Sequence, residues 1–170
     1  ADVPAVTHDE GIFDVQRSNA KLYEIATENG KYKSTDVSRL NPSAYAVGIT
    51  AHAVQQQPDM HHYAVLDDGT ITVLTFERDD KVVAITTFEI AGGTVEDIGV
   101  LPNVEQDDVY VVVNRGGTRY LEKFANEADQ RAVSTCALLD GHKVLTGSIS
   151  SITGATHFAS QTVQVWADGQ

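Results

Sequence analysis

The sequence predicts an all-β fold of antiparallel meanders that form β-propeller-type blades, followed by a small β-barrel-like unit. Three observations lead to this prediction. Apolar and polar residues alternate along short segments, as they do in strands that bury one face. Short turn sequences separate these segments. The pattern also recurs at a spacing of about 47 residues, which indicates a repeated structural unit.

The clearest series of strands lies in the middle of the chain. The Asp68-Gly69 dipeptide favours a two-residue hairpin turn there, and alternating segments flank it on both sides. A short Gln/Pro/Asp segment precedes the hairpin, and a pair of glycines ends the series. The four strands predicted in this meander cover residues 48–54, 63–66, 70–76 and 82–90.

The same pattern occurs twice more. At an offset of 47, Tyr63-Ala64-Val65 falls on Tyr110-Val111-Val112, and residues 51–54 fall on residues 98–101. A weaker copy lies upstream at an offset of 51, where strands at residues 12–15 and 21–25 match the central hairpin. Four-stranded units at near-equal spacing are typical of propeller blades, which bury their faces by stacking on neighbouring blades.

Two segments lie outside the strand pattern. Residues 35–45 predict a short helix or a single turn with Asp36 as its N-cap. Residues 124–134 are polar and predict a linker with a helical turn, because Glu127 and Arg131 have the spacing of an i,i+4 pair.

The predicted organisation has three parts. Residues 1–126 hold the blades, residues 127–136 form the linker, and residues 137–170 form the β-barrel-like unit, with strands near 144–146 and 162–166. Asp168-Gly169 favours a hairpin turn that no strand follows. We therefore expect this chain to be a piece of a longer protein, with a truncated barrel unit.

Composition narrows the function classes. The 170 residues contain 12 Lys/Arg and 24 Asp/Glu, a net charge of −12, and 42% of them are hydrophobic, as in a folded domain. The negative charge argues against a protein that grips nucleic-acid phosphates. No apolar run approaches the roughly 20 residues of a membrane-spanning helix, so no membrane insertion is expected. The single cysteine, Cys136, cannot form a disulfide within the chain.

Acidic residues occur in adjacent pairs. A glycan-degrading enzyme would need two carboxyl groups facing each other across a sugar, one of them with a raised pKa. Most of the pairs fall in predicted turns, which Asp favours because its side chain hydrogen-bonds to nearby backbone. We therefore expect turn residues rather than a catalytic pair. The pairs are Asp9-Glu10, Asp67-Asp68, Asp79-Asp80, Glu96-Asp97 and Asp107-Asp108.

The six histidines lack the spacing of metal ligands. His61 and His62 are adjacent on a predicted strand, so they point to opposite faces and cannot both bind one metal ion. We expect the histidines to be surface or edge residues with satisfied hydrogen bonds, and we expect no metal and no cofactor. The six are His8, His52, His61, His62, His142 and His157.

No motif for nucleophilic or phosphate chemistry is present. Gly147-Ser148-Ile149-Ser150 is not a nucleophile elbow, and Cys136 has no neighbouring histidine and is expected to be a small buried hydrophobe. Arg115, Arg119 and Lys123 form a basic cluster at a strand end, where a solvated face is expected. The sequence therefore predicts no catalytic, cofactor-binding or metal-binding residues, and no enzyme.

A series of short segments then follows a fixed order along nearly the whole chain, from about Gly11 to Gly169. In this order they resemble the tail-tube nozzle (tail stabilisation) proteins of short-tailed phages and prophages, and the last two resemble the small β-barrel that follows the blades in that family. The sequence departs from the family at the loop around Asn114 and near Ile85, where family members commonly carry a longer basic loop and an aromatic residue. The segments cover residues 11–18, 21–25, 32–40, 49–58, 63–75, 94–102, 107–115, 119–124, 151–158 and 162–169.

The resemblance implies a structural virion component, a nozzle-like module of the DNA-conducting tail tip. Its implied partners are other copies of itself in a ring and neighbouring tail proteins, with double-stranded DNA passing through without specific binding. Its implied location is the phage tail, assembled in the host cytoplasm. Family proteins are several times longer, and no catalytic residues are defined for this region. The acidic composition is compatible with this role, because a negative lumen avoids capture of phosphates.

Two alternatives stay open. The first is a glycan-degrading propeller hydrolase, which requires one pair of carboxyl groups in a pocket with a perturbed pKa. The second is a non-catalytic propeller-type scaffold that binds a protein or a glycan through an exposed aromatic patch. The chain contains six Tyr, five Phe and one Trp, and most of these are expected in the core.

Overall fold

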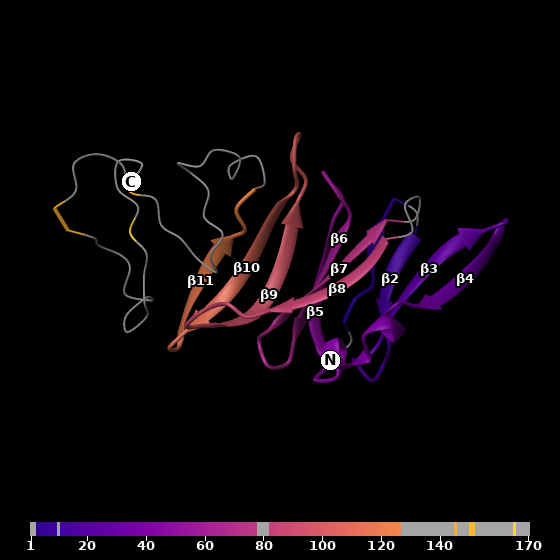
Figure 1. Cartoon of the computed structure of the whole chain (residues 1–170), viewed down its shortest axis with the longest axis horizontal. Coiled ribbons are helices and arrows are strands. Elements are labelled where there is room, and N and C mark those ends of the chain that lie inside the picture. Colours follow the sequence, from indigo (N-terminus) through magenta and orange to yellow (C-terminus); the bar gives the residue numbers. More distant parts are fainter. Residues whose placement is uncertain are drawn as a thin grey trace.

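The structure, a computed structural model, describes residues 3–9, 11–77 and 82–126, together with the single positions 145, 150, 151 and 165. This part holds eleven strands in three antiparallel sheets (Figure 1). The all-β class predicted from the sequence is confirmed. The elements are β1 (Val6–His8), β2 (Gly11–Val15), β3 (Leu22–Glu28), β4 (Lys31–Asp36), the 3-10 helices η1 (Ser38–Leu40) and η2 (Pro42–Tyr45), β5 (Ile49–Gln55), β6 (His61–Leu66), β7 (Ile71–Glu77), β8 (Val82–Phe88), β9 (Thr94–Leu101), β10 (Asp108–Arg115) and β11 (Thr118–Lys123).

Each sheet is a meander of strands that are consecutive in the chain. The first sheet has the order β1-β2-β3-β4, the second β5-β6-β7-β8 and the third β9-β10-β11. Every pairing within them is antiparallel. The predicted central meander therefore corresponds to the second sheet, with strand ends that differ by one or two residues.

Two strands of the first sheet were not predicted from the pattern. β1 has only three residues, too few for a periodic signal. β4 exposes almost all its side chains, so polar residues occupy both of its faces and the alternation is absent. The helical turn predicted at residues 35–45 is two separate 3-10 turns, and Asp36 is not an N-cap, since Val37 takes that position in η1.

The repeat determines which way each strand faces. Ala64 on β6 packs toward the first sheet, and Val111 on β10, 47 residues later, packs in the same direction, toward the second sheet. The predicted offset of 47 therefore holds for β6 and β10. It is wrong by one residue for β5 and β9, because Ala53 pairs with Tyr63 whereas Gly99 pairs with Tyr110, an offset of 46. The offset of 51 for the upstream copy is wrong by one residue. Phe13 on β2 faces the sheet that follows its own in the chain, as Tyr63 on β6 does, and the two residues are separated by an offset of 50. A one-residue shift would turn every side chain to the opposite face of the sheet.

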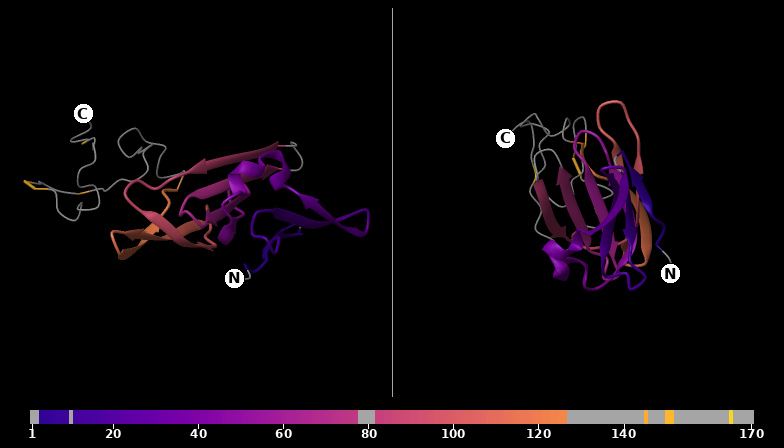
Figure 2. Two further views of the ribbon diagram at one scale, coloured as in Figure 1. Left: turned by 90° about the horizontal axis from the view of Figure 1, so that it is seen from below. Right: turned by 90° about the vertical axis from the view of Figure 1, so that its right-hand side faces the viewer.

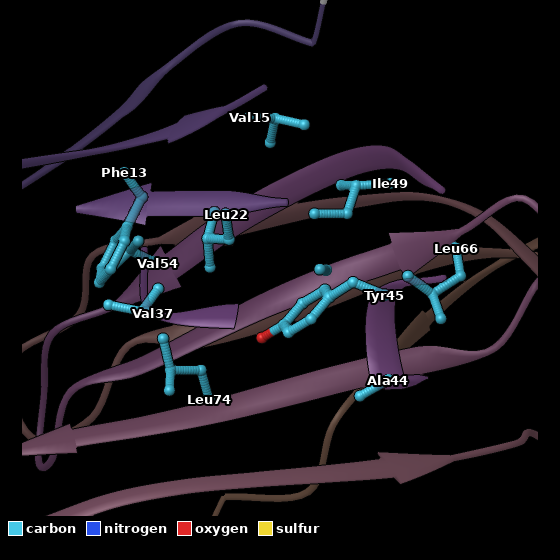
Figure 3. Close-up of a cluster of buried hydrophobic side chains, with 11 residues drawn as sticks. Phe13, Val15, Leu22, Val37, Ala44, Tyr45, Ile49, Val54, Leu66 and Leu74 are labelled. Atoms are coloured by element: carbon cyan, nitrogen blue, oxygen red, sulfur yellow. The ribbon is translucent and has the colours of Figure 1, made fainter. Parts of the chain in front are cut away.

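Two apolar cores lie between the three sheets, and we call them the first interface and the second interface. The middle sheet contributes alternate residues of β6 and β7 to each, so both of its faces are buried. Figure 3 shows the first interface, where side chains from β2, β3, η2, β5, β6 and β7 converge. The first interface buries Phe13, Val15, Leu22, Val37, Ala44, Tyr45, Ile49, Val54, Ala64, Leu66 and Leu74; the second buries Tyr63, Val65, Ile71, Ile90, Val95, Val109, Val111 and Val113.

The sheets stack along the long axis of the described part of the chain (Figure 2). Their first strands lie next to one another, because β5 contacts both β1 and β9. Their last strands lie on the outside, where β4 and β8 expose most of their side chains. First strands gathered together and last strands outside is the arrangement of propeller-type blades.

Backbone hydrogen bonds join neighbouring sheets at one end of their strands. The amide of Ile49 donates to Asn19 O at 2.7 Å, and the amide of Val95 donates to Gly69 O at 3.0 Å. Gly69 has a positive φ of 81°, and a Cβ there would lie 2.5 Å from Thr94 Cβ. The Asp68-Gly69 turn therefore requires glycine both for its backbone conformation and for the close approach of the third sheet.

The described sheets fall within residues 1–126, the predicted blade region. The predicted linker at residues 127–136, its Glu127–Arg131 pair and the β-barrel-like unit at 137–170 lie outside the described residues, apart from four single positions.

Candidate functional site

Three histidines from two neighbouring sheets lie at the first interface. His8 comes from β1, His52 from β5 and His62 from β6, and all three are buried. The prediction that the histidines are surface or edge residues is therefore wrong for these three. His61 and His62 do point to opposite faces, as predicted, and this places only His62 in the interface. No sequence pattern indicated a role for His8, because 44 residues separate it from His52.

The hydrogen bonds determine where the protons lie. His52 Nε2 is 2.5 Å from Pro4 O, and a carbonyl oxygen only accepts, so His52 carries its proton on Nε2. Its Nδ1 is then the acceptor, and His62 Nε2, at 2.8 Å, is the donor. This leaves His62 Nδ1 as a bare nitrogen, buried and without a hydrogen-bond partner. This assignment is that of two neutral rings, the form that burial favours for both histidines by lowering their pKa values.

The surroundings of the pair are largely apolar. The Phe13 ring lies 4.8 Å from that of His62 and stacks on His8 at 4.7 Å. Burial lowers the pKa of His52, although Pro4 O and Asp14 act in the opposite direction. Burial lowers the pKa of His62 further, and the nearby His52 and His8 act in the same direction. The third histidine lies near a carboxylate, because Glu24 Oε1 on β3 is 3.8 Å from His8 Nε2.

This cluster is not arranged as a metal site. Within the part of the chain that the structure describes, no group of three or more His, Cys, Asp or Glu side chains could hold a metal ion. The His52 and His62 nitrogens point at each other across a hydrogen bond rather than toward a shared point. The cluster is a polar network that joins two sheets.

The paired carboxylates do not converge. Asp67 and Asp68 lie in the β6–β7 turn as predicted, and Asp68 Oδ1 accepts hydrogen bonds from the Thr70 amide and hydroxyl. Glu96 and Asp97 lie on β9 instead of in a turn, so that prediction is wrong for this pair. Of the other predicted turn residues, Asp9 is in a turn, and Glu10 and the pair at 79–80 lie outside the described residues.

The pKa values of three of the carboxyl groups are lowered, which argues against a role as general acid. A hydrogen bond from Arg119 lowers the pKa of Glu96, and one from Lys123 lowers that of Asp108. Hydrogen bonds with Thr70 lower the pKa of Asp68. A general acid at neutral pH needs a raised pKa, so these three carboxyl groups are held in the ionised form instead.

Asp107 has a structural role that the sequence did not reveal. It is buried before β10, and its Oδ2 accepts from the amides of Gln56 at 2.8 Å and Gln57 at 3.2 Å, in the β5–β6 loop. Its Oδ1 accepts from the amide of Asn103 at 3.4 Å. One carboxylate thereby joins the second sheet to the third, and we call this group the Asp107 clamp.

The predicted basic cluster is ion-paired throughout. Arg115 is buried rather than solvated, its guanidinium donates to both carboxylate oxygens of Glu122 at 2.8 and 2.9 Å, and its Nη1 donates to Ala91 O. Arg119, on the exposed face, pairs with Glu96, and Lys123 Nζ lies 2.7 Å from Asp108 Oδ1. Each cation of this cluster is therefore committed to a carboxylate of the same sheet.

The described surface has shallow, polar depressions. The larger one, about 610 Å³, lies between η2 and the end of β8, and Asp68, Glu89, Asn41 and Thr87 are among the residues that line it. A second, of about 340 Å³, adjoins it beside Asp67 and Glu96. Cys136, His142, His157 and residues 147–149 lie outside the described residues.

Comparison with known proteins adds no assignment: no protein-family model matches the sequence, and no curated protein matches it. A search of the described residues for a helix long and apolar enough to cross a membrane finds none.

Proposed function

We propose that the chain is a structural module of a virion, a nozzle-like part of the tail tip of a short-tailed phage that acts through assembly and not through catalysis. Its partners are copies of itself and neighbouring tail proteins, arranged as a ring around passing double-stranded DNA. The proposal rests on the resemblance described above and on one structural observation, the open stack of repeated sheets.

The stack supports assembly because its end face on the third sheet repeats a face that is buried in the middle sheet. Tyr110 and Val112 on β10 lie 47 residues after Tyr63 and Val65, which pack into the second interface. They are only half-buried, and Leu121 beside Val112 is 72% exposed. A sheet with both faces apolar needs a neighbour on each side. A further sheet of the same kind would therefore cover this end.

The charges support a conduit rather than a nucleic-acid grip. The cations of the third sheet at Arg115, Arg119 and Lys123 are paired with carboxylates, and the chain carries a net charge of −12. Cations that are already paired within the sheet are poorly placed to hold phosphates, so DNA would pass this sheet without strong capture.

A glycan hydrolase is the second candidate. The 610 Å³ groove with Asp68 and Glu89 favours it, since sugars bind in polar grooves. The lowered pKa of Asp68 argues against it, because a general acid must keep its proton near neutral pH.

Light scattering and negative-stain imaging of the purified chain, over a range of concentrations and with other tail proteins added, test the proposal. We expect closed rings with several copies of the chain once the other tail proteins are added. A particle that never exceeds a few copies under all these conditions, together with cleavage of a glycan in a substrate screen, would overturn it in favour of the hydrolase.

A further inference from the structure

The outer edge of the middle sheet has an unusual composition. β8 runs over seven residues, Val-Val-Ala-Ile-Thr-Thr-Phe, without a charge, a glycine or a proline. It pairs with β7 along its whole length, from Ile71↔Phe88 to Glu77↔Val82. No strand of the described residues lies on its other side. Five of its seven side chains are exposed, among them Val82 at 43% and Val83 at 38%.

The other outer edges carry the charges that β8 lacks. β4 has Lys31, Lys33 and Asp36, and β11 has Arg119, Glu122 and Lys123. Charged side chains, lysine above all, protect edge strands from pairing with other chains, because pairing would bury them. A long, uncharged strand rich in β-branched residues is by contrast a template for strand addition. The contrast between edges of one repeat indicates that β8 is kept open for a partner.

We propose that the free edge of β8 is a docking site for β8 of a second copy of this chain, paired antiparallel across a two-fold axis. In an antiparallel pair, two residues that lie opposite each other either both direct their backbone N–H and C=O groups at the other strand or both direct them away. Adjacent residues differ in this direction, so a strand that pairs with a copy of itself must be centred on a residue and not between two residues. Centring on Ile85 uses all seven residues. It places Ala84 opposite Thr86, Val83 opposite Thr87 and Val82 opposite Phe88.

Charge favours this occupant. A partner strand with charged side chains would place them opposite apolar or threonine side chains on β8, with no counter-charge in the seven positions. β8 of a second copy brings only neutral, β-branched or aromatic residues, the cross-strand pairs that stabilise sheets most. The two-fold arrangement closes after two copies, so the pairing yields a dimer rather than a fibre. The inference does not depend on the proposed tail function.

The register gives a sharp test, because Ala84 and Thr86 are exposed on the same face and would oppose each other across the axis. The double variant Ala84→Lys/Thr86→Lys places lysine opposite lysine twice. The double variant Ala84→Lys/Thr86→Glu places lysine opposite glutamate twice. Sedimentation or light scattering of the full chain measures the dimer dissociation constant of each, and Ser34→Lys on the exposed β4 edge is the matched control.

We expect the original chain and the Ser34→Lys control to form a concentration-dependent dimer. The Lys/Lys variant should weaken the dimer by roughly tenfold or more, because like charges directly opposite repel. The Lys/Glu variant should return to within about threefold of the original chain. Circular dichroism and thermal melts confirm that the variants are folded. A chain that stays monomeric at millimolar concentration, or two double variants that dimerise equally, would overturn the proposal.

Discussion

The middle sheet packs against a neighbouring sheet at each of its two interfaces, and different polar groups join the sheets at each interface. At the first interface, the polar contacts are made by neutral histidines, His52 and His62, which are buried beside Phe13. At the second interface, the Asp107 clamp accepts backbone amides from the second sheet. Apolar burial supports both, but only the first includes a buried base without a hydrogen-bond partner. Repeated sheets can therefore share a fold while the contacts between them respond differently to acid.

The largest expected effect comes from removing the clamp at the second interface. Asp107→Ala leaves the amides of Gln56, Gln57 and Asn103 without their acceptor. We expect the free energy of unfolding to fall by about 3 kcal/mol, because three backbone amides lose the charged acceptor that joins the two sheets. Urea denaturation measures this loss. Asp59→Ala, in the exposed β5–β6 loop, is the control and should cost less than about 0.5 kcal/mol. Equal losses in the two variants would contradict the clamp.

Acid should act on the first interface. The folded-state pKa values of His52 and His62 lie below that of a free histidine, about 6.5, so the unfolded chain binds protons first. Stability is therefore fully present above this pH and is lost as the pH falls below it. The slope approaches about 1.4 kcal/mol per pH unit for each histidine that is charged only when unfolded. Urea denaturation at a series of pH values measures the slope.

Two variants test which residues cause this pH dependence of stability. His62→Leu removes the most deeply buried base, so the slope below pH 6.5 should decrease by about one proton. Val111→Ala destabilises the second interface without touching a histidine, so its slope should match that of the original chain. His52 and His61, whose pKa values burial also lowers, supply the slope that remains. A slope unchanged by His62→Leu would show that the network does not carry the acid response.

The smallest expected effect separates buried from exposed ion pairs within the third sheet. Arg115→Lys loses the two-pronged contact with Glu122 and should cost about 1 kcal/mol of stability, because lysine cannot match both carboxylate oxygens. Arg119→Lys changes a pair whose arginine side chain is 66% exposed, so it should cost less than about 0.5 kcal/mol. Chemical denaturation of both variants tests the difference. The reverse order of losses would contradict the role assigned to burial.

The sequence predicted the sheets well where one face of a strand is buried. β5, β6 and β7 alternate or turn at Asp68-Gly69, and their positions were predicted within one or two residues. β4 could not be predicted, because a strand exposed on both faces has no apolar period. The upstream offset was wrong by one residue because the loop between β2 and β3 differs in length from the Asp68-Gly69 turn, and spacing alone does not reveal facing.

The polar contacts were harder to predict than the strands. His52 and the carbonyl of Pro4 meet only because β1 and β5 lie side by side, a contact that strand patterns do not specify. The sequence pattern around Asp107 is that of an aspartate in a turn, and its burial depends on a loop 50 residues earlier in the chain. The partners of Arg115, Arg119 and Lys123 follow from the register of the third sheet, which the sequence did not determine.

Hydrogen exchange resolved by strand, at pH 7.5 and pH 5.0, tests most directly the claim that the two interfaces differ in their response to acid. After correction for intrinsic rates, we expect amides of β2, β3 and β5 to lose protection at pH 5.0, while those of β10 keep theirs. Equal loss in both sets, or loss confined to β10, would contradict the claim that the buried histidines make the first interface acid-sensitive.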